Sequence, residues 1–319
     1  MRLTQLMFAG VMVALVLLMA DIGFGKSENN TLILDMQTLQ DTCQLGDTIS
    51  LKISLKNTGK ETVEVNELDL DIQSLGLHIN YQGKRFYYTR VHSSPFQLKV
   101  FEKKPLDPGG KMDYTLAFPA VGVGDYQVYA EYLGAAGSMV ISSVRGFSVT
   151  PKDKLDNIVI RLQTTVGDIL IDLKPEESLG TVINFVTLVQ QGFYDGLLIY
   201  AVIKDTMIQA GDPHNNGGPG GPEYTIPFEK GMENQRKGTI SMLRLPWHMD
   251  TAGSQFMILT SDEAGFGFQG FLVIFGQVIE GLDVLDKINV TPVTSPKDGP
   301  RSNMPKTEIK INKMMLEFK

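Results

Sequence analysis

The sequence has little of the residue types on which many catalytic and metal sites depend. Its 319 residues include one cysteine, one tryptophan and four histidines. The single Cys43 excludes an internal disulfide, and His214 has no second His or Cys at ligand spacing, so no metal site is expected there. The net charge of −7 argues against nucleic acid as a partner, because nucleic-acid-binding proteins present a basic face.

Only one long apolar run is present, at residues 6–20. It follows the basic Arg2 and precedes the small Gly23 and Gly25, so residues 1–25 are predicted to be a secretory signal peptide. An uncleaved membrane anchor through residues 6–20 is the alternative, although this run is shorter than the roughly 20 residues that span a bilayer. Export without disulfides fits a bacterial periplasm or cell envelope better than an animal extracellular space.

Residues 26–150 are predicted to form seven to nine short strands. Residues 49–56 alternate apolar and polar side chains at a period of two, and residues 111–118 and 124–133 follow the same pattern. Gly, Pro and Asn turns separate these runs, which favours an antiparallel β-sandwich. The pattern resembles the immunoglobulin-like accessory domains of exported bacterial proteins. A polar segment, residues 151–156, is then expected to act as a linker.

Residues 157–319 alternate strands with two helical segments. Residues 158–173 read as a hairpin around Gly167, and Val182, Phe185, Val186 and Val189 lie on one face of a predicted helix. Thr181 is expected to be the N-cap of this helix and Gly192 its stop. Further strands and a second short helix follow. This half is therefore predicted to be a closed β-barrel with helical plugs, and the whole chain to be mostly β.

Five blocks of this half are similar to cyclophilins and occur in the same order, at residues 181–213, 217–229, 233–244, 252–260 and 275–288. The resemblance spans residues 157–319 and looks most like the bacterial branch. It implies an eight-stranded antiparallel barrel capped by two helices. It also implies peptidyl-prolyl cis-trans isomerase activity on X-Pro segments of polypeptides, without a metal or a cofactor.

Isomerisation of an X-Pro bond needs no nucleophile. The barrier of about 18–20 kcal/mol for an ordinary peptide bond reflects amide resonance, so a catalyst needs an apolar pocket for the ring and donors that favour the twisted amide. In cyclophilins the chief donor is an arginine, and the resemblance places Ala201 at that position. The family's histidine position falls on Leu272, while Gln209 and Gln255 keep catalytic positions.

The resemblance also implies a set of substrate-binding residues in an apolar groove, namely Met207, Phe256, Met257, Phe268, Leu243 and Arg244. Thr206 replaces a pocket phenylalanine, and the family's tryptophan falls near Phe266 or Gly267. Tyr200 replaces the motif histidine and is expected to point into the barrel. A structural or rim role is favoured for Arg244.

Two hypotheses follow from these replacements. The first is an exported isomerase-like protein that acts on X-Pro bonds in protein folding, with weakened catalysis. The second is a catalytically inactive module that binds proline-containing polypeptides, or a scaffold, on the same barrel. In either case the sandwich half is expected to offer a surface for envelope proteins.

Overall fold

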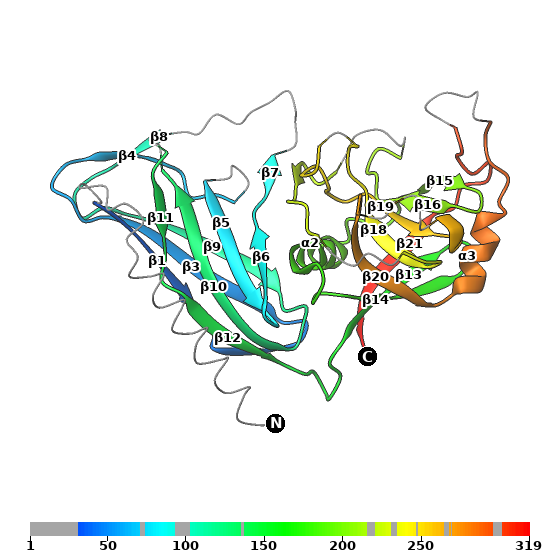
Figure 1. The fold of residues 1–319 in the computed structure, drawn as a ribbon, viewed down its shortest axis with the longest axis horizontal. Helices are drawn as coiled ribbons and strands as arrows, with labels where there is room; N and C mark the ends of the chain where they lie inside the picture. Colours follow the sequence, from blue (N-terminus) through cyan, green and yellow to red (C-terminus); the bar gives the residue numbers. More distant parts are fainter. Residues whose placement is uncertain are drawn as a thin grey trace.

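The protein is mostly β, and its two halves meet at a helix (Figure 1). The computed structural model describes residues 31–70, 74–92, 103–134, 137–215, 221–230, 235–246, 248–264, 268, 270–295 and 302–319. The predicted signal peptide lies outside these residues. In the described part of the chain no helix has the length and apolar character that crossing a bilayer would need.

Two larger sheets and a pair of short strands form most of the first half. One sheet has the order β1-β3-β9, from β1 (Leu32–Thr38), β3 (Thr48–Asn57) and β9 (Lys111–Pro119). The other has the order β2-β12-β10-β5-β6, from β2 (Thr42–Gln44), β12 (Arg145–Thr150), β10 (Gly124–Leu133), β5 (Leu75–Tyr81) and β6 (Lys84–Tyr88), with β11 (Met139–Ile141) paired to β10. The strands β4 (Val63–Asn66) and β8 (Lys103–Leu106) pair with each other.

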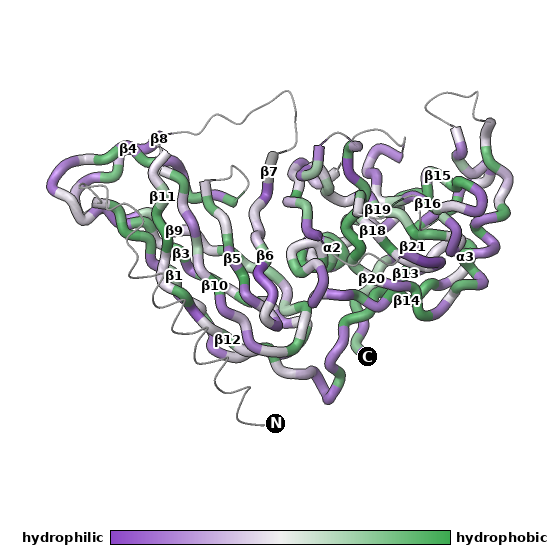
Figure 2. Tube along the Cα trace, viewed as in Figure 1, coloured by the Kyte–Doolittle hydropathy of each residue, from purple (hydrophilic) through white to green (hydrophobic). Residues whose placement is uncertain are grey.

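Alternating side chains give each of these sheets one apolar face. Along β3, Ile49, Leu51, Ile53 and Leu55 are buried and lie in the core between the sheets. Hydrophobic and hydrophilic residues alternate visibly along the strands in Figure 2. One feature departs from the antiparallel arrangement expected, because β2 pairs with β12 in parallel where the chain crosses from one sheet to the other.

The second half is built on one curled sheet of eight strands, in the order β15-β16-β19-β18-β20-β14-β13-β21. These are β13 (Ile158–Thr164), β14 (Asp168–Leu173), β15 (Ile199–Ile203), β16 (Met207–Ala210), β18 (Thr239–Met242), β19 (Phe256–Leu259), β20 (Val273–Glu280) and β21 (Ile311–Phe318). The two ends of this order meet, since Ile199 N donates to Ile309 O at 2.9 Å and Ile311 N to Leu197 O at 2.8 Å. This closes the sheet into the expected barrel.

Helix α2 (Leu179–Gln190) lies between the halves, and α3 (Leu282–Asn289) lies at the opposite side of the barrel (Figure 1). The sequence predicts one buried face for α2, but nearly all of its residues are buried. The reason is that α2 packs on β20 and β21 of the barrel and also on β6 and β9 of the first half. The Lys84–Glu177 ion pair, at 2.8 Å, lies at the same junction.

A carboxylate from a distant loop stabilises the start of α2. The helix begins at Leu179, so Thr181 lies inside its first turn and is not the expected N-cap. Glu229 instead accepts hydrogen bonds from Gly180 N at 2.9 Å, Thr181 N at 2.7 Å and the Thr181 hydroxyl at 2.6 Å. Burial raises the pKa of Glu229 and these three bonds lower it, with burial the larger effect. A carboxylate placed there satisfies two N–H groups that the helix cannot pair itself.

Replacing Glu229 by alanine is expected to lower the free energy of unfolding by about 2 kcal/mol, because two helix N–H groups lose their acceptor. Chemical denaturation of the full chain measures the change. The matched control is Glu263→Ala, an exposed carboxylate whose loss should change stability by less than about 0.5 kcal/mol. Equal effects of the two substitutions would contradict the role of Glu229.

Candidate functional site

The outer face of the barrel carries the side chains that the resemblance assigns to the site. Ala201 pairs with Gln209 across β15 and β16, and Gln209 pairs with Met257 across β16 and β19. Directly opposed residues of antiparallel strands project from the same face, so these three side chains lie in one row. The next row is formed by Ile203, Met207 and Leu259.

These rows form a separate apolar cluster, here called the outer cluster. Its buried members are Met207, Met257 and Leu259, and the partly buried residues packed against them are Ile203, Leu243, Ala264, Phe268 and Leu272. Met257 has no exposed area and Met207 only 7 %. The two methionines are therefore a covered floor, and a ligand would first meet the partly exposed side chains above them.

Phe256 lies on the other face of β19 from this cluster. It is 1 % exposed and belongs to the core inside the barrel. Its ring makes edge contacts with Phe185 and Tyr194, each with centroids 5.7 Å apart. Phe256 thus supports the site from beneath, where the sequence analysis expects a substrate contact.

The two positions expected to carry the family's polar catalytic groups are apolar in this structure. Ala201 is 8 % exposed and its methyl group cannot donate a hydrogen bond. Leu272 packs against the outer cluster. Gln209 is nearby, but its Nε2 lies 3.4 Å from Met207 Sδ, a weak acceptor.

Tyr200 is buried, as its expected position in the barrel requires, and it contacts a residue of the site. Its hydroxyl donates to Gln255 Oε1 at 2.8 Å. Burial, followed by the charge of Asp212, raises the pKa of Tyr200, so the phenol stays protonated and able to donate. Because this bond occupies the oxygen of the Gln255 amide, it fixes which side of the amide carries the NH2 group. The feature of the sequence that could have pointed to this role is that Tyr200 replaces the histidine of the family motif.

Arg244 is engaged by backbone carbonyls. Its Nε donates to Phe271 O at 2.6 Å and its Nη1 to Leu245 O at 3.1 Å, and its guanidinium carbon lies 5.6 Å from the ring centroid of Phe228. These contacts tie two loops at the rim of the outer cluster. They favour the rim role expected for Arg244 over that of a replacement donor.

An exposed aromatic at this rim was not anticipated from the sequence. Phe271 is 62 % exposed and directly precedes Leu272 of the outer cluster. Such a large exposed ring beside an apolar cluster is a suitable contact for a ligand. Thr206 lies in the turn between β15 and β16, while Phe266 and Gly267, the positions nearest the family's tryptophan, lie outside the described residues.

Comparisons with known proteins agree with this arrangement. A family model described as "Cyclophilin type peptidyl-prolyl cis-trans isomerase/CLD" matches residues 159–316. The peptidyl-prolyl cis-trans isomerase-like 1 protein of Neurospora crassa is 32 % identical over 158 residues, which cover 48 % of this chain and 91 % of that protein. The chain belongs to the cyclophilin family.

Membership applies to the second half, hereafter the cyclophilin domain. The human peptidyl-prolyl cis-trans isomerase-like 4 is 33 % identical over 171 residues, but the match covers only 33 % of that protein. A cyclophilin type isomerase of Cryptosporidium parvum, crystallised in the presence of the dipeptide Ala-Pro, has a TM-score of 0.43 and 27 % identity, covering 50 % of this chain and 98 % of that one. The human and Neurospora relatives are eukaryotic and do not support the bacterial branch expected from the sequence.

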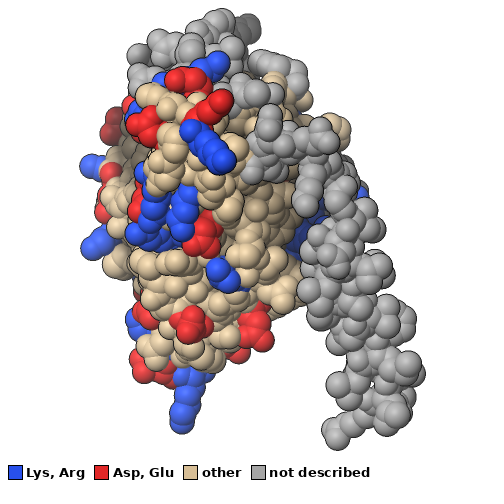
Figure 3. All heavy atoms as spheres, turned by 90° about the vertical axis from the view of Figure 1, so that its left-hand side faces the viewer, with Lys and Arg blue, Asp and Glu red and all other residues tan. Residues whose placement is uncertain are grey.

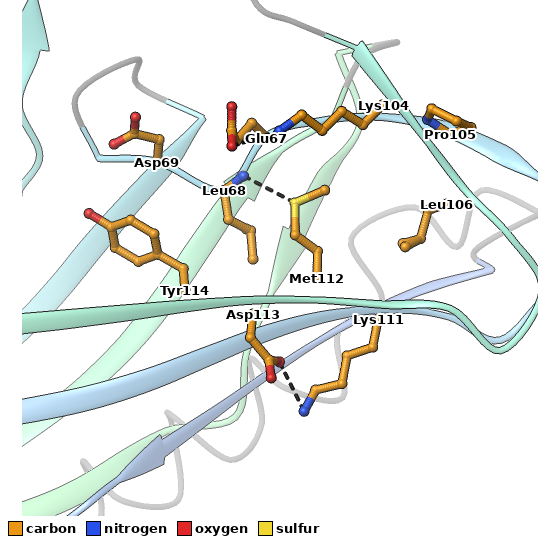
Figure 4. Close-up of a pocket in the computed structure, with 10 residues that line it drawn as sticks. All are labelled: Glu67, Leu68, Asp69, Lys104, Pro105, Leu106, Lys111, Met112, Asp113 and Tyr114. Atoms are coloured by element: carbon orange, nitrogen blue, oxygen red, sulfur yellow. Dashed lines mark hydrogen bonds and ion pairs between the residues drawn. The ribbon is translucent and has the colours of Figure 1, made fainter.

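Other parts of the molecule offer weaker sites. A hollow of about 450 Å³ lies between β4, β8 and β9, over the apolar Leu68, Leu106 and Met112 (Figure 4). The charges around it are paired, as Lys104 with Glu67 and Lys111 with Asp113. Figure 3 shows acidic and basic side chains interspersed over this end of the molecule. Among the described residues, no group of three His, Cys, Asp or Glu side chains could hold a metal ion.

Met257→Ala is expected to lower the free energy of unfolding by about 2–4 kcal/mol, because the side chain is wholly buried in the outer cluster. Thermal or chemical denaturation of the full chain measures this loss. Phe271→Ala removes an exposed ring of the same region and should change stability by less than about 0.5 kcal/mol. A small loss for Met257→Ala would show that the cluster is open to solvent.

Proposed function

We propose that the cyclophilin domain binds extended proline-containing segments of other polypeptides on its outer face, and that its isomerase activity is weak. The observation that carries the proposal is the pairing of Ala201 with Gln209 in the row where the family's arginine would lie. The partly exposed residues Leu243, Phe268 and Phe271 supply apolar surface for a proline ring. Support for this ligand class comes from the relative crystallised in the presence of Ala-Pro.

The weak catalysis follows from what twisting the amide requires. A twisted X-Pro bond loses its resonance, and a positioned donor lowers its energy relative to the planar bond. Removing one preorganised donor costs a rate factor of about 100 to 1,000 in other enzymes. Contacts with the proline ring alone are nearly the same for planar and twisted bonds, so they hold the segment without accelerating its isomerisation.

A second candidate function, isomerisation without the arginine, is favoured by one contact. The Tyr200 hydroxyl holds the Gln255 amide in a defined orientation, and a fixed amide is a donor that needs no reorganisation. In this case the acceleration by the protein would be lost in a Gln255→Ala variant.

We further propose that the chain is exported, to a bacterial periplasm or cell envelope, through the signal peptide predicted at residues 1–25. The first half would then be an immunoglobulin-like sandwich that offers a surface to envelope proteins. Its two facing sheets with a shared apolar core are compatible with this proposal. Mass spectrometry of the protein purified from its native source measures whether the mature chain begins near Lys26.

Ala201→Arg is expected to raise the isomerase kcat/KM of the full chain by about 10- to 100-fold, because it restores a charged donor. A protease-coupled or NMR exchange assay on a short X-Pro peptide measures the rate. Ala201→Met is the matched control, since it adds length at the same position without a donor and should leave the rate unchanged.

Peptide binding by the same variants is measured by NMR, from the chemical-shift changes that the X-Pro peptide causes. A wild-type rate that already equals that of Ala201→Arg would contradict weakened catalysis. Absence of binding in every folded variant would contradict the proposed function as a whole.

A further inference from the structure

The first half of the chain reaches the loop that carries Gln255. Strand β7 (Val91–His92) pairs with β17 (Tyr224–Thr225), so the cyclophilin domain receives a strand from the first half (Figure 1). The next residue of that segment, Ile226, donates its N–H to Ala252 O at 2.8 Å. A Cβ atom at Gly253 would lie 3.1 Å from Tyr224 O. The backbone two residues before Gln255 is therefore in contact with the strand that β7 holds.

A chain of side-chain contacts runs in parallel with this backbone contact. The guanidinium carbon of Arg90 lies 4.5 Å from the ring centroid of Tyr224, and Arg90 Nε donates to the Tyr88 hydroxyl at 3.3 Å. The Tyr224 hydroxyl in turn donates to Asn184 Oδ1 at 2.7 Å. A cation stacked on a ring at this distance restrains the ring's position.

Asn184 connects Tyr224 to the loop that carries Gln255. Its Nδ2 donates to Gly253 O at 2.7 Å, in a buried bond. Both ends of the amide are thus occupied, one by Tyr224 and one by Gly253, which leaves the side chain a single orientation. A shift of the Tyr224 ring would break one of these bonds or move Gly253, and a buried polar group left unpaired is costly.

We infer that the first half positions the peptide-binding loop of the cyclophilin domain through Arg90. In this arrangement Arg90 is a positioning residue: it holds Tyr224, Tyr224 orients Asn184, and Asn184 fixes Gly253 and the following Gln255. The expected effect of Arg90 on peptide binding rests on the proposed function, whereas its effect on the placement of Gly253 and Gln255 does not. The first half therefore helps to set the geometry of the site in addition to offering a surface of its own.

The test is an NMR measurement on the full chain labelled with 15N-glycine and 15N-glutamine. Arg90→Ala should shift the Gly253 amide and the Gln255 side-chain amide signals, and should weaken binding of a short X-Pro peptide by about three- to tenfold. Arg90→Lys retains a cation over the ring and should restore most of both effects. Tyr224→Phe keeps the ring but removes the donor to Asn184, so it should shift the same two signals.

Lys84→Ala is the matched control, because it removes another cation at the same junction, one that pairs with Glu177 and not with Tyr224. It should leave the Gly253 and Gln255 signals unchanged. Unchanged signals in Arg90→Ala, or equal shifts in Lys84→Ala, overturn the inference. If no variant and not even the wild type binds the peptide while the signals shift as described, the proposed function fails and the positioning role stands.

Discussion

The pairing of β16 with β19 is the constraint on which the site depends. It places Met207, Gln209 and Met257 outside the barrel and Phe256 inside it. A slip of one residue would exchange the two faces, and the packing of Phe256 against Phe185 and Tyr194 opposes it. Because the register is fixed, the residue that lies directly opposite Ala201 in this row is Gln209, whose Nε2 lies 3.4 Å from Met207 Sδ.

This constraint also limits which residues could replace the lost donor. The Tyr200 hydroxyl already donates its hydrogen bond to Gln255, and Lys204 lies in the turn beyond the end of β15. Arg244 has the charge, but three backbone carbonyls within hydrogen-bonding distance hold its guanidinium at the rim. In the described part of the chain, the candidate donors for the X-Pro amide are the side-chain amides of Gln209, which pairs with Ala201, and of Gln255, which bonds Tyr200.

The sequence predicts the first half better than it predicts the faces of the barrel strands. Strand β3 buries its apolar side chains on one side only, so its alternation is visible in the sequence. All four residues of β19 are buried, two on each face, and no alternation remains to tell inside from outside. The assignment of Phe256 to the groove therefore rested on resemblance alone, and the structure places it inside. Resemblance did place Met207 and Met257 in one cluster.

Contacts between the halves are the part that no local pattern can reveal. The sequence predicts that α2 packs one apolar face on the barrel. In the structure the first half also covers the helix, so nearly all of its residues are buried. Arg90 and Tyr224 are far apart in the sequence, and neither belongs to an alternating run that would predict their stacking. Only the folded arrangement brings a residue of the first half into contact with the segment beside the loop that carries Gln255.

Binding and catalysis respond differently to such an arrangement. Apolar contacts with a proline ring stabilise the planar and twisted bond to a similar extent, so they raise affinity without lowering the barrier. A donor aimed at the twisted amide does lower it, but only when its position is held within a fraction of an ångström. With alanine at position 201, the side-chain amides of Gln209 and Gln255 are the candidates for this role. The placement of Gln255 depends on Tyr200 directly and on the Arg90 contact indirectly, so the rigidity of the junction between the halves affects whatever catalysis Gln255 supports.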